Sequence, residues 1–194
     1  MSVVTGPDGR DRCAWVGDDS EYRRYHDEEW GRPLHGDRPL FEKMSLEGFQ
    51  AGLSWITILR KRPAFRHAFS GFDPVVIAAF GDDDVERLMA DAGIVRNRAK
   101  ILATIGNARI VAEMPDGALD ALMWAYAPDA ADRPRPRTFA DVPATTRESD
   151  ALSRDLKKRG FRFVGSTTMY ALMQSSGMVD DHLEGCWRAA DPRE

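Results

Sequence analysis

Two cysteines and two histidines have the residue types and the spacing of a metal site. Twelve residues separate Cys13 from His26, and His182 and Cys186 lie four positions apart near the other end of the chain. Thiolates and neutral imidazoles are preferred ligands of Zn²⁺, and two of each complete a tetrahedral shell. Such a zinc would have no position left for water, so it would be structural and would hold the two ends of the chain together. The alternative is four unrelated side chains, because the gap between the pairs is much longer than in a compact zinc finger.

A carboxylate close to several aromatic residues suggests a pocket for a flat ring. Glu47 lies in an apolar segment beside Gly48, with Gly52 a little further on, so another group could approach it closely. Aromatic faces combined with a carboxylate favour an electron-poor or cationic ring. The alternative is core packing by the aromatic residues, with Glu47 facing solvent. The tryptophans and tyrosines of the first 55 residues are the candidates for this pocket: Trp15, Tyr22, Tyr25, Trp30 and Trp55.

Residues 84–112 have the pattern of a helix-hairpin-helix. Two helical patterns are joined by a short turn that contains Gly93, and basic residues open the second helix. We expect Gly93 to adopt a positive φ, which other residues resist. The N-terminus of the second helix would then present backbone N–H groups to a DNA phosphate, without reading sequence. The alternative is an ordinary helical hairpin. The residues expected to contact the DNA backbone are Gly93, Ile94, Arg96, Arg98 and Lys100.

The elements that position these residues are predicted to be helices, because apolar residues recur at helical spacing and no run of alternating strands occurs. Expected caps are Ser20, Asp37, Asp82 or Asp83, and Ser149 or Asp150. Pro63 is expected to end the helix that begins near Leu53. The predicted helices cover about 20–30, 37–46, 53–59, 74–80, 82–93, 96–112, 118–126, 149–159 and 167–176, and 127–148 is predicted to be an extended loop.

The composition is that of a soluble globular protein of 194 residues, with 43% hydrophobic and 30% charged residues. The net charge of −4 excludes an evenly basic coat for nucleic acid, although residues 94–110 and 154–162 are locally basic. No stretch approaches the roughly 18 consecutive apolar residues of a membrane span, and the first residues lack the apolar run of a signal peptide. We therefore expect no membrane partner and a cytoplasmic protein, with a flexible leader over 1–11 and one domain over 12–190.

Several segments together resemble the 3-methyladenine-DNA glycosylase I family of bacteria, which is part of the helix-hairpin-helix superfamily. They follow one another from Cys13 to Cys186, so the resemblance covers nearly the whole chain, and the segment Gln50–Trp55 is the most specific. The matching segments are 13–16, 25–31, 46–48, 50–56, 91–94, 156–161, 163–165, 181–182 and 185–186.

The resemblance implies an all-α helix-hairpin-helix glycosylase fold, with one structural zinc per chain bound by Cys13, His26, His182 and Cys186. It implies that Glu47 is the catalytic and base-binding acid, and that Trp55, Tyr22 and Tyr25 surround the damaged base, with Trp15 and Trp30 nearby. The family hydrolyses the N-glycosidic bond of 3-methyladenine in alkylated double-stranded DNA after flipping the base out. Free 3-methyladenine and an abasic site remain, with no lyase step, and such enzymes act as monomers.

Three readings differ in what they require of the site. A catalytically silent, zinc-containing DNA-binding module would have lost the pocket acid or a tryptophan, whereas Glu47 and Trp55 are both present. A zinc hydrolase is disfavoured, because protein ligands would fill all four metal positions. No catalytic aspartate is assigned, since neither Asp116 nor Asp120 lies in a convincing motif.

Overall fold

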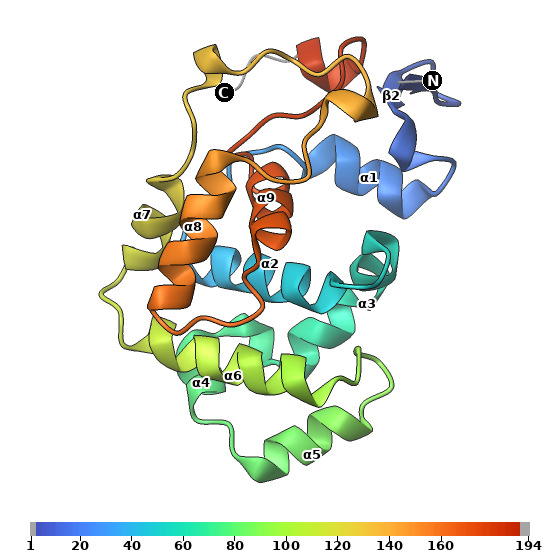
Figure 1. Ribbon diagram of the computed structural model, residues 1–194. Coiled ribbons are helices and arrows are strands. Elements are labelled where there is room, and N and C mark those ends of the chain that lie inside the picture. The colour runs from blue at the N-terminus through green and yellow to red at the C-terminus, as the bar shows by residue number, and fades with distance from the viewer. Residues whose placement is uncertain (1–2, 191–194) are drawn as a thin grey trace.

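The computed structural model describes residues 3–190, and in this range the protein is mainly helical, as expected (Figure 1). The central helix α2 (Asp37–Gln50) packs against four other helices, α3, α6, α7 and α9. The remaining helices are α1 (Ser20–Glu28), α3 (Trp55–Ala68), α4 (Pro74–Ala78), α5 (Asp82–Ala90), α6 (Arg98–Ala112), α7 (Ala118–Trp124), α8 (Arg147–Lys158) and α9 (Ser166–Ser175).

The two ends of the described chain lie side by side. Strands β1 (Val3–Thr5) and β2 (Asp11–Cys13) form an antiparallel hairpin in which Val3 pairs with Cys13. The last turn, η5 (Trp187–Ala190), contacts β2, and Figure 1 shows both at the same end of the molecule. Residues 3–11 of the expected leader therefore contribute secondary structure, whereas residues 1 and 2 lie outside the described part. This arrangement brings Cys13 close to the C-terminal segment.

One hydrophobic core extends from α1 to the segment after α9. Phe65, in the last turn of α3, is fully buried and packs on Phe49, with 4.7 Å between the ring centroids. The prediction that Pro63 ends this helix is wrong, because α3 continues through it to Ala68. An interior proline costs roughly 3 kcal/mol. The burial of Phe65 and Ala68, which requires the last turn, offsets that cost.

Two of the predicted caps are displaced by one or a few residues. Asp19, rather than Ser20, caps α1, since its carboxylate accepts from the Tyr22 backbone N–H at 2.9 Å. Thr146 caps α8 by accepting from the backbone N–H of Ser149 at 3.2 Å. In both cases the cap lies upstream of the expected residue, and its extended backbone lets its side chain reach the first turn of the helix.

Asp37 has a different function from the expected cap. It is the first residue of α2, which follows Gly36, and its carboxylate accepts from the backbone N–H groups of Gly117 and Asp120 at 2.8 and 2.9 Å. It therefore satisfies the free donors at the start of α7, a helix 80 residues further on. This contact ties α7 to the central helix.

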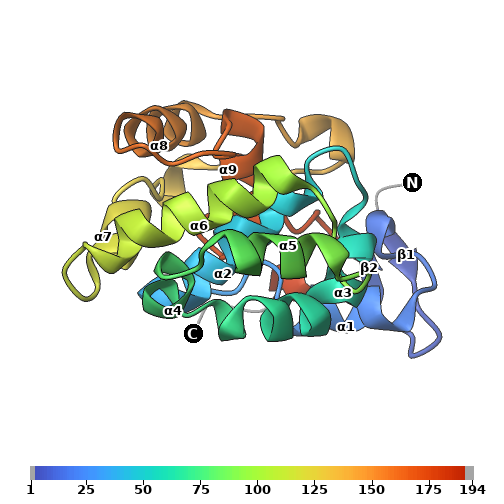
Figure 2. The ribbon, with the colours of Figure 1, turned by 90° about the horizontal axis from the view of Figure 1, so that it is seen from below.

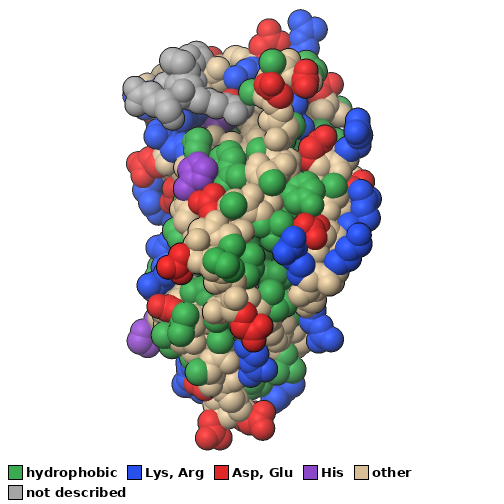
Figure 3. All heavy atoms as spheres, turned by 90° about the vertical axis from the view of Figure 1, so that its left-hand side faces the viewer, with side chains coloured by type: hydrophobic (Ala, Val, Ile, Leu, Met, Phe, Trp, Pro, Cys, Tyr) green, Lys and Arg blue, Asp and Glu red, His purple; other side chains and the backbone are tan. Residues whose placement is uncertain are grey.

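The hairpin helices α5 and α6 lie next to each other, with α4 packed on α6, on the lower side of the molecule (Figure 2). On the face at the side of α7, acidic and basic side chains are mixed around a central area of hydrophobic ones (Figure 3). A DNA-backbone surface is expected to be predominantly basic. None of the helices in residues 3–190 has the length and apolar character required to cross a bilayer.

Candidate functional site

Glu47 points into the interior from the central helix. Only 4% of the residue is exposed, and its Oε1 accepts a hydrogen bond of 2.9 Å from the Ser175 hydroxyl of α9. Burial raises the pKa of Glu47 to about 7, although the positive charge of Lys43 and the hydrogen bond from Ser175 oppose this shift. Near neutral pH the carboxyl group can therefore be present with or without its proton. This burial excludes the alternative in which Glu47 faces solvent.

Two of the expected aromatic residues, Tyr22 and Tyr25, lie near this acid, and Trp55 packs on Tyr25. Tyr25 is 2% exposed and its ring centroid is 5.5 Å from that of Trp55. The pKa values of Tyr22 and Tyr25 are raised by burial first and then by the negative charge of Glu47, which lies within electrostatic reach of both. The indole N–H of Trp55 is buried without a hydrogen-bond partner in the described part of the chain. An unpaired buried donor is costly, so it marks a place where a ligand atom could accept.

Trp15 and Trp30 lie at the border between this pocket and the histidines. The Trp15 ring contacts both Tyr22 and Trp30, with centroids 4.8 and 5.3 Å away. Trp30 in turn lies 4.6 Å from the ring of His182. Trp30 therefore packs against the two histidines of the candidate metal site.

The sequence reasoning missed two residues of the pocket, Lys43 and Ser175. Lys43 precedes Glu47 by one helical turn and is 8% exposed. Its spacing of four residues from Glu47 places both on one face of α2, and a lysine on an otherwise apolar face was the signal that could have revealed it. Ser175 gave no such signal, because only the packing of α9 on α2 brings it to the carboxylate.

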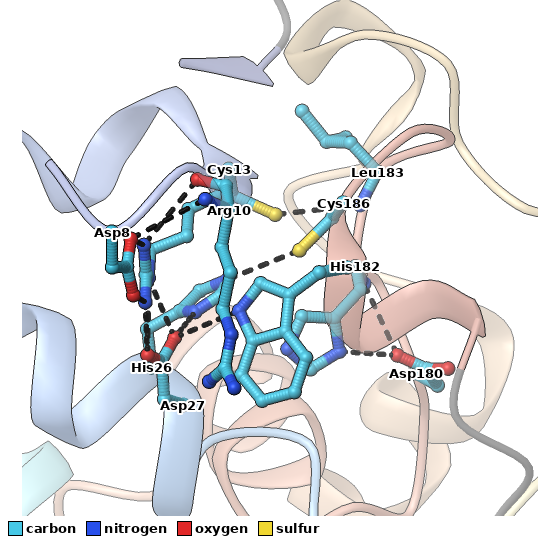
Figure 4. A network of polar contacts seen from close by, with 11 residues as sticks. Asp8, Arg10, Cys13, His26, Asp27, Asp180, His182, Leu183 and Cys186 are labelled. Carbon is cyan, nitrogen blue, oxygen red and sulfur yellow. Dashed lines mark hydrogen bonds and ion pairs between the residues drawn. The ribbon is translucent and has the colours of Figure 1, made fainter. Parts of the chain in front are cut away.

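Cys13, His26 and Cys186 form a buried group that could hold a metal ion. Their ligand atoms all lie within 4.8 Å of one another. The sulfur of Cys186 is 3.5 Å from Nε2 of His26, and Figure 4 shows the two sulfur atoms pointing toward each other. The contact with Cys13 lowers the pKa of Cys186 to about 4 and raises that of Cys13, so one negative charge is favoured on the pair.

His182 lies against this group without belonging to its three closely spaced members. Its ring centroid is 5.0 Å from that of His26. Its Nδ1 is 2.7 Å from the Asp180 carboxylate, and its Nε2 is buried with no partner in residues 3–190. His26 has the same arrangement, with Nδ1 2.8 Å from the Asp27 carboxylate. A carboxylate on one ring nitrogen leaves the other free for a metal, which is the usual outer environment of a ligating histidine.

The close approach of His182 to the segment after α1 requires a glycine at position 31. A Cβ added to Gly31 would lie 2.7 Å from Cε1 of His182, and Gly31 has a φ of +74°. A larger residue would therefore push His182 away from His26.

Gly93 is in the hairpin turn for a different reason from the one expected. It is not among the glycines with positive φ. A Cβ at this position would lie 3.0 Å from Cβ of Ala64 and 2.9 Å from the carboxylate of Asp91, which accepts from the Gly93 backbone N–H at 2.7 Å. Glycine is needed because the turn packs closely on α3. Ile94 is 3% exposed and fixes the turn to the core.

The three basic residues of the hairpin have different surroundings. Lys100 is 8% exposed, and its ammonium group donates to the carbonyl oxygens of Phe49 and Ala51 at 2.9 and 2.7 Å. The Lys100 charge is therefore used at the end of α2, which argues against the expected contact with the DNA backbone. Arg98 is exposed and pairs with Glu86 at 2.6 Å. Arg96 is exposed and precedes α6, because Asn97 rather than Arg96 begins that helix as its cap.

The comparisons with known proteins agree with this description. A model of the methyladenine glycosylase family matches residues 15–189. DNA-3-methyladenine glycosylase 1 of Escherichia coli (strain K12) is 48% identical over 178 residues, which are 91% of this chain and 95% of that protein. The crystal structure of a 3-methyladenine DNA glycosylase I has a TM-score of 0.85 at 45% identity, covering 93% of this chain and 100% of the other.

A second solved structure, of a 3-methyladenine DNA glycosylase I variant in complex with 3-methyladenine, has a TM-score of 0.84 at 31% identity and covers 94% of this chain and 99% of the other. A helical fold with a hairpin of this kind and a buried aromatic and acidic pocket is typical of DNA glycosylases that excise a damaged base. The chain belongs to the methyladenine glycosylase family. The expected family and fold are therefore confirmed.

Proposed function

We propose that this DNA-3-methyladenine glycosylase excises 3-methyladenine by holding the flipped base between the aromatic side chains and Glu47. The observation that carries the mechanism is a 4% exposed carboxylate within electrostatic reach of Tyr22 and Tyr25, with Trp55 packed on Tyr25. Flipping a nucleotide costs a few kcal/mol, and less for a damaged base. Contacts of a cationic ring with aromatic faces contribute about 0.5–2 kcal/mol each, so the pocket can offset that cost.

The chemistry of the substrate explains why a modest pocket suffices. Methylation at N3 places a positive charge on the adenine, which makes the base a good leaving group. Cleavage of the glycosidic bond returns the bonding electrons to the base and neutralises it, while water adds to the sugar carbon and loses a proton. The protein therefore has to bind and orient the base rather than to protonate it.

Glu47 is proposed to select the methylated base. Its carboxylate accepts hydrogen bonds from the amino group of the adenine and favours the positive charge of the ring. A cation beside Glu47 lowers its pKa, so binding of the substrate and ionisation of the acid support each other. Burial makes this interaction stronger than it would be in water.

The hairpin is proposed to hold double-stranded DNA through its phosphates, with Arg96, Arg98 and the backbone at Gly93 as the contacts. Such binding is independent of sequence and decreases steeply with salt. We further propose that the protein acts as a monomer in the cytoplasm.

The metal group is proposed to hold one structural zinc. Cys13, His26 and Cys186 would be joined by His182, whose Nε2 is buried and unpaired in the described residues. Four protein ligands would leave no position for water, so the ion would stabilise the contact between the ends of the chain rather than take part in base release.

Base release from methylated DNA tests the proposal. DNA treated with a methylating agent is incubated with the wild-type protein and with Glu47→Gln, and free bases are separated by chromatography. We expect the wild type to release 3-methyladenine and to spare 7-methylguanine, and Glu47→Gln to lose most of this activity. Strand breaks at the abasic sites without alkali would contradict the absence of a lyase step.

The alternative function is a silent DNA-binding module that keeps the hairpin and the metal group. The buried Glu47 and the unpaired Trp55 N–H argue against a degenerate pocket. Folded wild-type protein that binds DNA and zinc but releases no base would establish this alternative.

A further inference from the structure

We propose that Lys43 is a positioning residue that fixes the hydroxyl group of Tyr25 as a hydrogen-bond donor toward the bound base. The inference rests on the proposed function of the pocket, and it adds a residue that acts on the base through another side chain.

The position of the Lys43 ammonium group carries this inference. Nζ lies 3.4 Å from the Tyr25 hydroxyl oxygen and donates to it. The same atom is 4.8 Å from the centroid of the Tyr25 ring and 5.4 Å from that of Trp55. Lys43 therefore contacts the two aromatic rings proposed to hold the base, from within the protein.

The surroundings of Lys43 are unusual for a lysine. The residue is 8% exposed, and it forms no ion pair within 4 Å in the part of the chain that the structure describes. Burial lowers the pKa of Lys43, and the negative charges of Glu47 and Glu29 oppose that effect. A buried cation without a carboxylate partner lowers the stability of the fold. Proteins keep such unfavourable residues mainly at functional sites.

The chemistry of the two groups determines the direction of the hydrogen bonds. An ammonium group has three N–H donors and no acceptor. The Tyr25 oxygen must therefore accept from Lys43, and its own O–H must donate to a different atom. Tyr25 is 2% exposed, and within residues 3–190 its O–H has no hydrogen-bond acceptor. A ring nitrogen of a base stacked beside Tyr25 and Trp55 would provide one.

This donor is expected to act mainly in the transition state. While the base is attached to the sugar it is cationic, and its ring nitrogens are weak acceptors. They become better acceptors as the glycosidic bond breaks and the base gains electron density. The ammonium group also withdraws charge from the phenol and strengthens it as a donor. Loss of Lys43 should therefore reduce kcat more than it raises KM.

A double-mutant cycle tests the proposal. Lys43→Met, Tyr25→Phe and the double variant are compared with the wild type in single-turnover release of 3-methyladenine. We expect each single variant to be about tenfold slower. The double variant should be no slower than Tyr25→Phe, because Lys43 acts only through the hydroxyl group that this variant lacks. Lys43→Arg keeps the donors and should recover part of the rate.

Two results would overturn the proposal. One is that Lys43→Met slows base release in the Tyr25→Phe background as much as it does in the wild type. This result would mean that the lysine acts independently of the Tyr25 hydroxyl, for example as a counter-ion of Glu47. The other is a Lys43→Met protein as fast as the wild type. Circular dichroism confirms that each variant is folded, and Lys43→Gln replaces Lys43→Met if the latter is not. Failure of the proposed function would differ from both results, because the wild type would then release no base.

Discussion

The buried carboxylate of Glu47 is proposed to bind the base, and its charge is expected to lower the stability of the fold. A buried carboxyl group that ionises without a close cation is costly, and the nearest compensation comes from the Ser175 hydroxyl and from Lys43, which does not form an ion pair with it. The side chain that binds the base is therefore expected to weaken the fold when it is charged. Sequence pattern and family resemblance both pointed to Glu47, but the pattern alone left a solvent-facing residue as an alternative.

The cost of the charged carboxylate should be visible when the free energy of unfolding of Glu47→Gln is compared with that of the wild type. The folded protein binds the Glu47 proton more tightly, with a pKa of about 7 against the usual 4.5, so the free energy of unfolding falls as the pH rises from about 4.5 to 7. We expect Glu47→Gln to raise the free energy of unfolding at pH 8 by about 3 kcal/mol. Its Tm should rise by roughly 6–12 °C, and the difference should disappear below pH 4.5.

Thermal unfolding across this pH range provides the measurement. Glu113→Gln, on the exposed end of the hairpin region, is the matched control and should change little. A Glu47→Gln protein that is less stable than the wild type at pH 8 would mean that the carboxylate is well compensated in the fold.

At the scale of elements, the basic start of α6 serves two purposes. Lys100 satisfies carbonyl groups at the C-terminal end of α2, whereas Arg96 lies exposed before the helix. The sequence presented both as equal basic residues after a glycine turn. Only the packing of α6 on α2 separates them, because a lysine stem of four carbons reaches a neighbouring helix end as readily as solvent.

Substituting Lys100 and Arg96 one at a time should distinguish a residue that stabilises the fold from one that binds DNA. Lys100→Met leaves two carbonyl groups without a donor, so the free energy of unfolding should fall by about 1–3 kcal/mol with little change in affinity for undamaged DNA. Arg96→Ala should leave stability within about 0.5 kcal/mol. It should weaken DNA binding and lower the slope of log K against log salt by about 1. Denaturant unfolding and titrations at several salt concentrations check both, and the opposite pairing of effects would disprove the assignment.

At the scale of the whole molecule, the metal group joins segments that are far apart in the chain. Cys13 ends β2, His26 lies in α1, and Cys186 precedes the last described turn. Asp27 supports this junction, because Arg12 and the indole N–H of Trp187 donate to its carboxylate. The ends of the chain are thus held by polar contacts and by a candidate ion, outside the main hydrophobic core.

Removal of the metal should therefore lower stability. We expect the purified protein to contain one zinc per chain by elemental analysis, and a strong chelator to lower the Tm by roughly 10 °C. His182→Ala should reduce the zinc content, whereas His67→Ala, at an exposed position, should not. The rate of base release per folded molecule should stay unchanged. Loss of turnover with the Tm preserved would instead indicate a catalytic ion, and an absence of zinc would disprove the site.

The sequence by itself determined the helical class, the order of the helices and the residue types of the pocket and metal group. Helical periodicity and side-chain chemistry are local properties that a linear sequence records. The tertiary structure decided which carboxylate caps α7, that α3 continues through Pro63, and that Gly93 is needed for close packing. It also decided that the Lys100 and Lys43 ammonium groups face the interior. These outcomes depend on contacts between residues distant in the chain, and burial free energy there outweighs local preference.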